Sequence, residues 1–319
     1  MTRLVWLLWL VLSVPALARP NNRAEATRVL EDFLSGRMSV NQATNRLTFL
    51  GEAGFATEEL IGAHRRSDPK LQAQILEVVV GLGVVNEDTE KYLVRALDTD
   101  DVAQLVTATR GLGKVRSARG LTRVTENLAA KQPVVRKESA KALGEMRSPK
   151  PGKALVEAAK KETDLETKLA MVVAVGKCGD KKQVGALEAM LKDESEGTRA
   201  AAAQALCLLG AKSGVAYATG LLASPEKLAR LQGVLLFEGA TAKVAGGPLK
   251  VALSDKDHRV RATAARVLAE GGDKTKVDWL VLESAKAVGE DRLPYEDQLE
   301  KLRLPDDARQ EILKKAGLK

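Results

Sequence analysis

Small and aliphatic residues recur along the chain in a pattern that repeats about every 31 positions. Six nine-residue segments align without gaps and carry these residues at helical spacing. They begin at Leu105, Arg136, Lys168, Arg199, Arg230 and Arg261. The same register extends back to Gly51 and Gly83, and the segment ends then lie 32, 30, 31, 32, 31, 31 and 31 residues apart. Chance does not preserve such a period, so the pattern predicts a repeat protein.

A second series of apolar positions follows the first. Its members are Val124, Leu155, Leu187, Ala218, Leu249 and Leu280, spaced by 31 or 32 residues. Around Leu187, the residues Val184 and Leu191 complete the i, i+3, i+7 stripe of an amphipathic helix. The two series therefore predict two helices in each repeat. The first is amphipathic, and the second is rich in small residues, which let neighbouring helices approach closely.

Turn-forming residues separate the predicted helices, as at Asp98–Asp101, Ser224-Pro225 and Gly271–Asp273. No segment carries the signals of a sheet. We therefore expect an all-α fold, a right-handed α-α superhelix of about eight two-helix repeats of about 31 residues, in which each repeat buries its faces against its neighbours.

The solenoid is expected to be continuous over residues 51–285. Residues 19–50 are expected to form an N-terminal helical cap, in which Ser39 and Gln42 make a capping box. Residues 286–319 are expected to form a C-terminal helical cap, interrupted at Leu293-Pro294 and Leu304-Pro305 and closed by a short helix over Asp306–Lys315.

Residues 1–18 have the layout of a secretory signal peptide. Arg3 is the only charge, an apolar run over Leu4–Leu12 follows, and the segment ends on Ala16-Leu17-Ala18. The run is shorter than the ~20 residues that span a bilayer, which favours cleavage after Ala18 over a membrane anchor. No later segment is apolar for long enough to span. We therefore expect an exported mature chain that is periplasmic or secreted.

Residues Asp257–Leu268 resemble the HEAT-repeat pattern, in the short form of the phycobilisome-lyase-like HEAT proteins. That pattern reads Asp-x-x-Val-Arg-x-x-Ala-Ala-x-Ala-Leu-Gly, and the chain departs from it at Val267 and Ala269. Residues Val135–Gly144 are also close to it. The resemblance covers roughly residues 45–285. It implies a HEAT/armadillo-like solenoid and says almost nothing about function.

Charge is concentrated in one stretch. The chain has 50 Lys and Arg against 42 Asp and Glu, a net charge of +8. The stretch Arg110–Lys161 alone holds 14 basic and four acidic residues, a net of +10, so the mature chain is otherwise slightly acidic. A solvated surface and a site for an anionic partner explain this stretch equally well. Because it has no aromatic residue to stack on bases, nucleic acid is a poor candidate.

A column of basic residues repeats with the period of the chain: Arg136, Lys168, Arg199, Arg230 and Arg261. The favoured interpretation is structural, because residues that recur in every unit usually serve the repeat. Each would pair with an acid in the turn before its helix, such as Asp164, Asp193, Glu226 or Asp257. The alternative is a binding ladder. The candidate partner-binding residues are this column together with Lys137 and Lys141.

Catalytic signatures are missing from the sequence. No HExxH, GxSxG or P-loop pattern occurs, and the two histidines, His64 and His258, lie in charged contexts where we expect them to be exposed. Cys178 and Cys207 are expected to be buried free thiols, because neighbouring helices hold them too far apart for an unstrained bridge. No catalytic, cofactor-binding or metal-ligating residue is predicted. An exported chain with 3% aromatic residues is also a poor candidate for the phycobilin-lyase activity of some relatives.

The sequence therefore predicts an exported, non-enzymatic scaffold or adaptor that binds a protein partner in the cell envelope, with an acidic protein among the candidates. Two alternatives stay open. One is a lyase- or hydrolase-type enzyme on a HEAT scaffold, and the other is binding of an anionic polymer through residues 110–161. The identity of the partner and the oligomeric state are left open.

Overall fold

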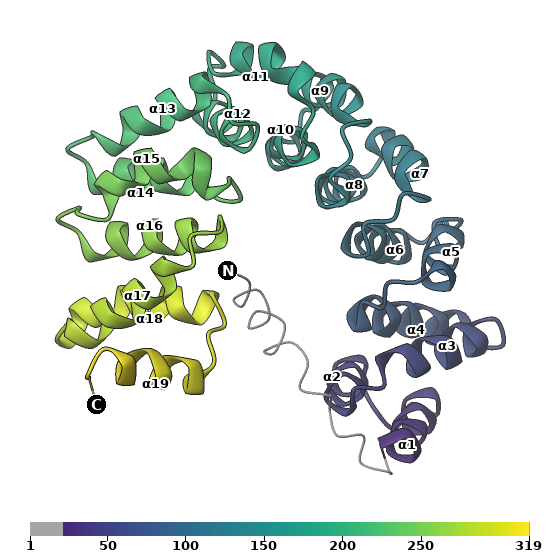
Figure 1. Ribbon diagram of the computed structural model, residues 1–319. Helices are drawn as coiled ribbons and strands as arrows, with labels where there is room; N and C mark the ends of the chain where they lie inside the picture. Colours follow the sequence, from purple (N-terminus) through teal and green to yellow (C-terminus); the bar gives the residue numbers. More distant parts are fainter. Residues whose placement is uncertain (1–21, 319) are drawn as a thin grey trace, which may run out of the picture. The chain divides into compact units, whose positions relative to one another are not determined.

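The computed structural model describes residues 22–318, which form nineteen α-helices, three short 3-10 helices and no strand (Figure 1). The all-α fold is thereby confirmed. The described residues fall into two compact units, residues 22–127 (unit 1) and 128–318 (unit 2). The predicted signal peptide lies outside the described residues. No helix in the described part is both long and apolar enough to cross a membrane.

In unit 1, first and second helices alternate and form two rows (Figure 1). The first helices are α1 (Asn22–Leu34), α3 (Ala53–His64), α5 (Glu87–Arg95) and the short α7 (Leu121–Glu126). The second helices are α2 (Val40–Leu50), α4 (Pro69–Leu82) and α6 (Val102–Lys114). Second helices pack on one another, α2 on α4 and α4 on α6, and α3 and α5 pack on the second helices that follow them. The 3-10 helix η1 (Asn127–Ala129) follows α7.

Unit 2 continues the same alternation. Its second helices are α8 (Pro133–Met146), α10 (Leu165–Cys178), α12 (Glu196–Leu208), α14 (Lys227–Leu235), α16 (His258–Glu270) and α18 (Leu293–Lys301). Its first helices are α9 (Gly152–Lys161), α11 (Val184–Met190), α13 (Lys212–Leu222), α15 (Ala242–Ala252) and α17 (Thr275–Lys286), followed at the end by α19 (Asp306–Lys315). The 3-10 helices η2 (Lys181–Gln183) and η3 (Gly289–Arg292) lie in connections. Helices α8, α10 and α12 pack side by side, as do α14, α16 and α18, and α12 and α14 are joined through a shared core.

The second helices begin where the sequence supplies an N-cap. In α4, α6, α10, α12 and α16 an Asp or Ser side chain accepts a hydrogen bond from a backbone N–H of the first turn, which satisfies a donor that the helix leaves unpaired. The predicted capping box of Ser39 and Gln42 is present at the start of α2. The second helices can therefore be numbered from their N-caps.

The repeat predicted from apolar positions is the buried core. All six members of the second series are fully buried: Val124, Leu155, Leu187, Ala218, Leu249 and Leu280. Small residues hold neighbouring second helices close together, as expected. A Cβ atom on Gly176 of α10 would lie 2.5 Å from Cα of Ala205 on α12, a distance that no real contact allows.

Two local expectations were wrong. The residue of α4 that faces Gly111 is Val80, not Gly83, which instead ends α4 in the left-handed conformation. The register that the sequence analysis extends back to Gly83 therefore does not hold in α4. Leu293-Pro294 does not interrupt the chain but begins α18, because proline is tolerated in the first helical turn, where its missing N–H costs nothing. The helix expected over Asp306–Lys315 is present as α19.

The histidines are half-buried rather than exposed. The His64 ring meets Tyr92 edge-on, with the ring centroids 5.2 Å apart, and burial lowers the pKa of His64. Nδ1 of His258 lies 3.2 Å from the Tyr295 hydroxyl. Their charged sequence neighbours hid these aromatic partners, which come from other helices.

The close approach at Gly176 gives a test of helix packing. We expect Gly176→Ala to lower the free energy of unfolding by about 1–3 kcal/mol, because the new methyl group pushes against the backbone of α12. Gly185→Ala is the matched control, since a Cβ on this residue of α11 meets no atom within 4 Å. It should raise stability by about 0.5–1 kcal/mol through helix propensity. Urea unfolding followed by circular dichroism measures both, and equal effects of the two changes would contradict the packing.

Cys178 and Cys207 are both free and buried, as predicted. Burial raises the pKa of each thiol to about 12, and nearby Asp180 adds to the effect at Cys178. At pH 8 we therefore expect neither thiol of the folded protein to react with a disulfide reagent at the rate of an exposed cysteine. When the protein is denatured without reduction, both thiols should react, so that each chain consumes two equivalents of the reagent. Fewer than two would mean that a bridge had formed.

Candidate partner-binding surface

The basic column is built into the turns that precede the second helices. Each member stands four residues after the N-cap of its helix. In α8, Nη1 of Arg136 donates hydrogen bonds to the carbonyl oxygens of Ala130 and Lys131 at 2.9 and 2.8 Å. Equivalent bonds to the turns before α12, α14 and α16 come from Arg199, Arg230 and Arg261. These guanidinium groups therefore satisfy carbonyl groups that the turn leaves without helical partners.

Three members of the column also bind a carboxylate from the turn one repeat further on. Nε of Arg230 lies 2.7 Å from Oδ2 of Asp255, whose Oδ1 accepts the backbone N–H of Asp257 at 2.9 Å. The pairs Arg136–Glu162 and Lys168–Asp193 are equivalent, at 2.6 and 3.2 Å. The hydrogen bond from Arg136 holds the pKa of Glu162 below its usual value. Each carboxylate thus joins a side chain of one repeat to the backbone of the next turn.

The column does not pair with the acids of its own turns, and this detail of the structural interpretation was wrong. At the N-caps of α10 and α16, the carboxylates of Asp164 and Asp257 accept backbone N–H groups of the first helical turn. The basic side chains bind the turn carbonyls instead. A role of the column in partner binding stays a prediction, and the structure places its charges within the protein's own contacts.

Lys137 and Lys141 lie on a different side of α8 from the column. They stand five and nine residues after the N-cap. Nζ of Lys137 pairs with Glu166 of α10 at 2.9 Å. Lys141 is exposed, and no bond ties it to any other residue between 22 and 318. Of the seven predicted residues, Lys141 is therefore the one whose charge is most available to a partner.

We define the row surface of unit 2 by the residues that stand five and nine positions after the N-cap of its second helices. It consists of Lys137 and Lys141 on α8, Leu169 and Val173 on α10, Ala200 and Gln204 on α12, and Leu231 and Leu235 on α14. On α16 the equivalent residues, Ala262 and Arg266, are buried. Leu165 and Leu228, near the starts of α10 and α14, add exposed apolar side chains with exposed fractions of 51% and 74%.

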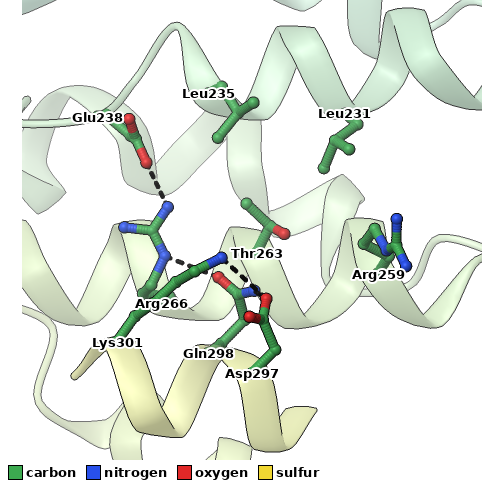
Figure 2. A pocket seen from close by; sticks show the side chains of 9 residues that line it. All are labelled: Leu231, Leu235, Glu238, Arg259, Thr263, Arg266, Asp297, Gln298 and Lys301. Carbon is green, nitrogen blue, oxygen red and sulfur yellow. Dashed lines mark hydrogen bonds and ion pairs between the residues drawn. The ribbon is translucent and has the colours of Figure 1, made fainter. Parts of the chain in front are cut away.

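A hollow opens on the row surface where α14, α16 and α18 meet (Figure 2). Its volume is about 360 Å³. Leu231 and Leu235 form an apolar wall, and the remaining lining is polar: Glu238, Arg259, Thr263, Arg266, Asp297, Gln298 and Lys301.

Arg266 holds the three helices around the hollow together. Its side chain is 8% exposed and binds Glu238 beyond α14 and Gln298 of α18 (Figure 2). It also binds Glu270 at the end of α16. The bonds to Glu270 and Gln298 measure 2.7 and 2.8 Å. Burial opposes the charge, but these hydrogen bonds outweigh it and raise the pKa of Arg266. Its donors are therefore used within the protein.

Sequence analysis did not find the hollow. Arg266 and Arg259 were visible only as parts of the HEAT-like pattern, and α18 was not predicted. The visible signal was the spacing of Leu231 and Leu235, two leucines one turn apart at places where α8 carries lysines. Because α10 also carries aliphatic residues at these places, Leu169 and Val173, the signal was not specific to the hollow.

The basic stretch divides between the two units, and much of it is engaged. In unit 1, Arg119 pairs with Glu87 and Arg123 with Asp98, both at 2.7 Å. Lys114 donates to two carbonyl groups at the end of α4. These contacts account for part of the local charge without a partner.

The described residues hold no group of three or more His, Cys, Asp or Glu side chains that is placed to bind a metal ion. Apart from Arg259, the charged side chains that line the hollow are already paired. Binding of a polar and apolar group is the chemistry that this arrangement supports.

Comparison with known proteins identifies the repeats. A family model of HEAT repeats matches residues 106–175 and 152–236. A chain from the structure of the complex of CpcE and CpcF of phycocyanin lyase from Nostoc is similar, with a TM-score of 0.54 and 15% identity, covering 77% of this chain and 94% of that chain. Human deoxyhypusine hydroxylase, solved in complex with glycerol, gives a TM-score of 0.34 and 19% identity over 77% of this chain and 97% of that chain, and supports no argument. The search of curated proteins found no match.

Residues 106–236 therefore carry HEAT repeats and the chain has the fold of an α-α superhelix, which confirms the resemblance stated from the sequence. Since the Nostoc chain is only 15% identical, this likeness establishes the fold alone.

The turn contacts give a test of what the column does. We expect Arg230→Met to lower the melting temperature by several degrees, because it leaves Asp255 and two turn carbonyls without their partner. Lys227→Met is the control, because Lys227 is half-exposed and its contact with Asp257 is longer, at 3.4 Å. Thermal unfolding followed by circular dichroism compares the two. A column that served only a partner would leave the melting temperature of Arg230→Met unchanged.

Proposed function

We propose that the protein is an exported, non-enzymatic scaffold or adaptor that binds a protein partner in the cell envelope through the row surface of unit 2. The observation that carries the proposal is the row surface itself, which carries exposed aliphatic side chains on α14 and, on α8, a lysine with no described partner. Leu235 is 36% exposed, and Lys141 occupies the equivalent place on α8. A partner segment with apolar and acidic residues is complementary to such a surface.

The repeat architecture supports binding rather than catalysis. A row of parallel second helices presents one long surface, which suits an extended partner. Catalysis needs titratable groups whose protonation is free to change. Within the hollow, Glu238 and Asp297 are bound to Arg266 and Lys301. The proposal that the chain is not an enzyme rests on this arrangement.

Export is part of the proposal on sequence grounds. The signal-peptide layout of residues 1–18 supports it. The partner is then a protein of the cell envelope, whether the exported chain lies in the periplasm or outside the cell.

Charge reversal at the row surface tests the proposal. We expect Lys141→Glu to reduce capture of envelope proteins by the immobilised mature chain at least about fivefold, because the new charge repels an acidic partner. Lys137→Glu should act in the same direction, and both effects should shrink at high salt. Quantitative mass spectrometry of the captured proteins gives the measurement.

Lys153→Glu is the matched control. Lys153 is an exposed lysine of the same basic stretch, but it lies on the first helix α9. The control should keep full capture, and the melting temperatures of all variants should agree. Equal losses for Lys141→Glu and Lys153→Glu would point to binding of an anionic polymer by overall charge, and no loss for either would contradict the proposed surface.

A further inference from the structure

The lining of the hollow between α14, α16 and α18 includes one cation without an ionic partner. Its lining contains three cations, Arg259, Arg266 and Lys301, against the two carboxylates of Glu238 and Asp297. Arg266 binds Glu238, and Nζ of Lys301 lies 2.8 Å from Asp297. Glu270, outside the lining, also binds Arg266. The cation left over is Arg259, which is exposed and whose guanidinium group has no bond to any residue in the described part of the chain.

A second polar group in the hollow is also available. Thr263 is 4% exposed and lines the hollow, as Figure 2 shows. No other described residue makes a hydrogen bond with its hydroxyl group. A hydroxyl group can donate to a carboxylate, so Thr263 supplies a hydrogen-bond donor on the wall of the hollow.

The opposite wall is apolar. Leu231 and Leu235 lie one turn apart on α14, and Leu228 extends the same face toward solvent, where it is 74% exposed. A space of about 360 Å³ accommodates a large side chain together with a short polar group. The two walls together require a ligand that is apolar on one side and anionic on the other.

We propose that this hollow is an anchor pocket for a partner segment in which a large apolar side chain adjoins an Asp or Glu. The apolar side chain packs on Leu231 and Leu235, and the carboxylate binds Arg259 and Thr263. This inference rests on the proposed function and names the chemistry of the partner at one point of the row surface. The rigid contacts of Arg266 hold the walls in place before binding, so that little ordering is required when the segment arrives.

Capped peptides test the pocket without the natural partner. The probe is acetyl-Gly-Phe-Glu-Gly-amide, titrated into the mature chain while the methyl resonances of Leu231 and Leu235 are followed by NMR. We expect both resonances to shift with saturation. The peptide with Gln in place of Glu should bind about tenfold more weakly, because it loses a charge-assisted contact with Arg259. The peptide with Ser in place of Phe should not bind.

Variants assign the effect to Arg259. Arg259→Gln should bind the Glu and Gln peptides equally, with an unchanged melting temperature. Arg28→Gln is the control, because Arg28 is an exposed arginine of α1 with no bond to a described residue. It should keep the preference for Glu. A further probe, acetyl-Gly-Gly-Phe with a free terminal carboxylate, separates the sources of the anion. If it binds more tightly than the Glu peptide, the pocket recognises the terminal carboxylate of a chain rather than an Asp or Glu side chain, and the proposal is wrong.

The pocket is also excluded if no methyl shift occurs up to about 10 mM peptide, a concentration at which even very weak specific binding is detected. Failure here does not decide the proposed function. If Lys141→Glu still reduces capture while the peptides do not bind, the row surface binds its partner elsewhere. If the peptides bind while Lys141→Glu and Lys137→Glu have no effect, the pocket is real and the wider surface is wrong.

Discussion

The contact between a basic side chain and the turn before its own helix is the constraint on which unit 2 depends. A turn between two helices leaves carbonyl groups without helical partners, and Arg136 and its equivalents supply the donors. In three repeats the same side chain also binds a carboxylate of the following turn, and that carboxylate accepts backbone N–H groups there. Successive turns are thereby linked. The start of each second helix is fixed relative to the next, and this brings equivalent places of the helices onto one surface.

This use of charge changes how the basic composition is interpreted. A buried pair gains little net stability, because desolvation opposes it, but it specifies one geometry. The cations of the column and Arg266 of the hollow work in this way, since each is bound to groups of the protein itself. What is left for a partner is smaller and more specific than the net charge of +8 indicates. Lys141 at one end of the row surface and Arg259 at the other are available, with aliphatic side chains between them.

The sequence predicted the repeat, the alternation of helix types and the buried series, because these follow from periodic burial, which every repeat must satisfy. The sequence did not predict contacts between side chains that lie far apart in the sequence. The column's carboxylates lie about 25 residues further on, the ring beside His64 comes from another helix, and Arg266 meets Gln298 from a helix that was not predicted. The hollow forms only where α14, α16 and α18 pack together. Local patterns carry no information on such a junction, although the leucines at places where α8 has lysines were a visible departure.

That departure is the strongest reason to connect the two ends of the row surface. Single exposed leucines are ordinary on protein surfaces and need no explanation. Here, however, Leu231 and Leu235 occupy the same places as Lys137 and Lys141, and Leu228 is more exposed than either leucine of the pair. Leu169 and Val173 of α10 are aliphatic at the same places, and Leu231 packs in part on the core of unit 2. The exposed parts of Leu235 and Leu228 are left for contact with the apolar part of a partner. The basic end and the apolar hollow then recognise different parts of one segment, so that changes at α8 and at α16 should weaken the same complex.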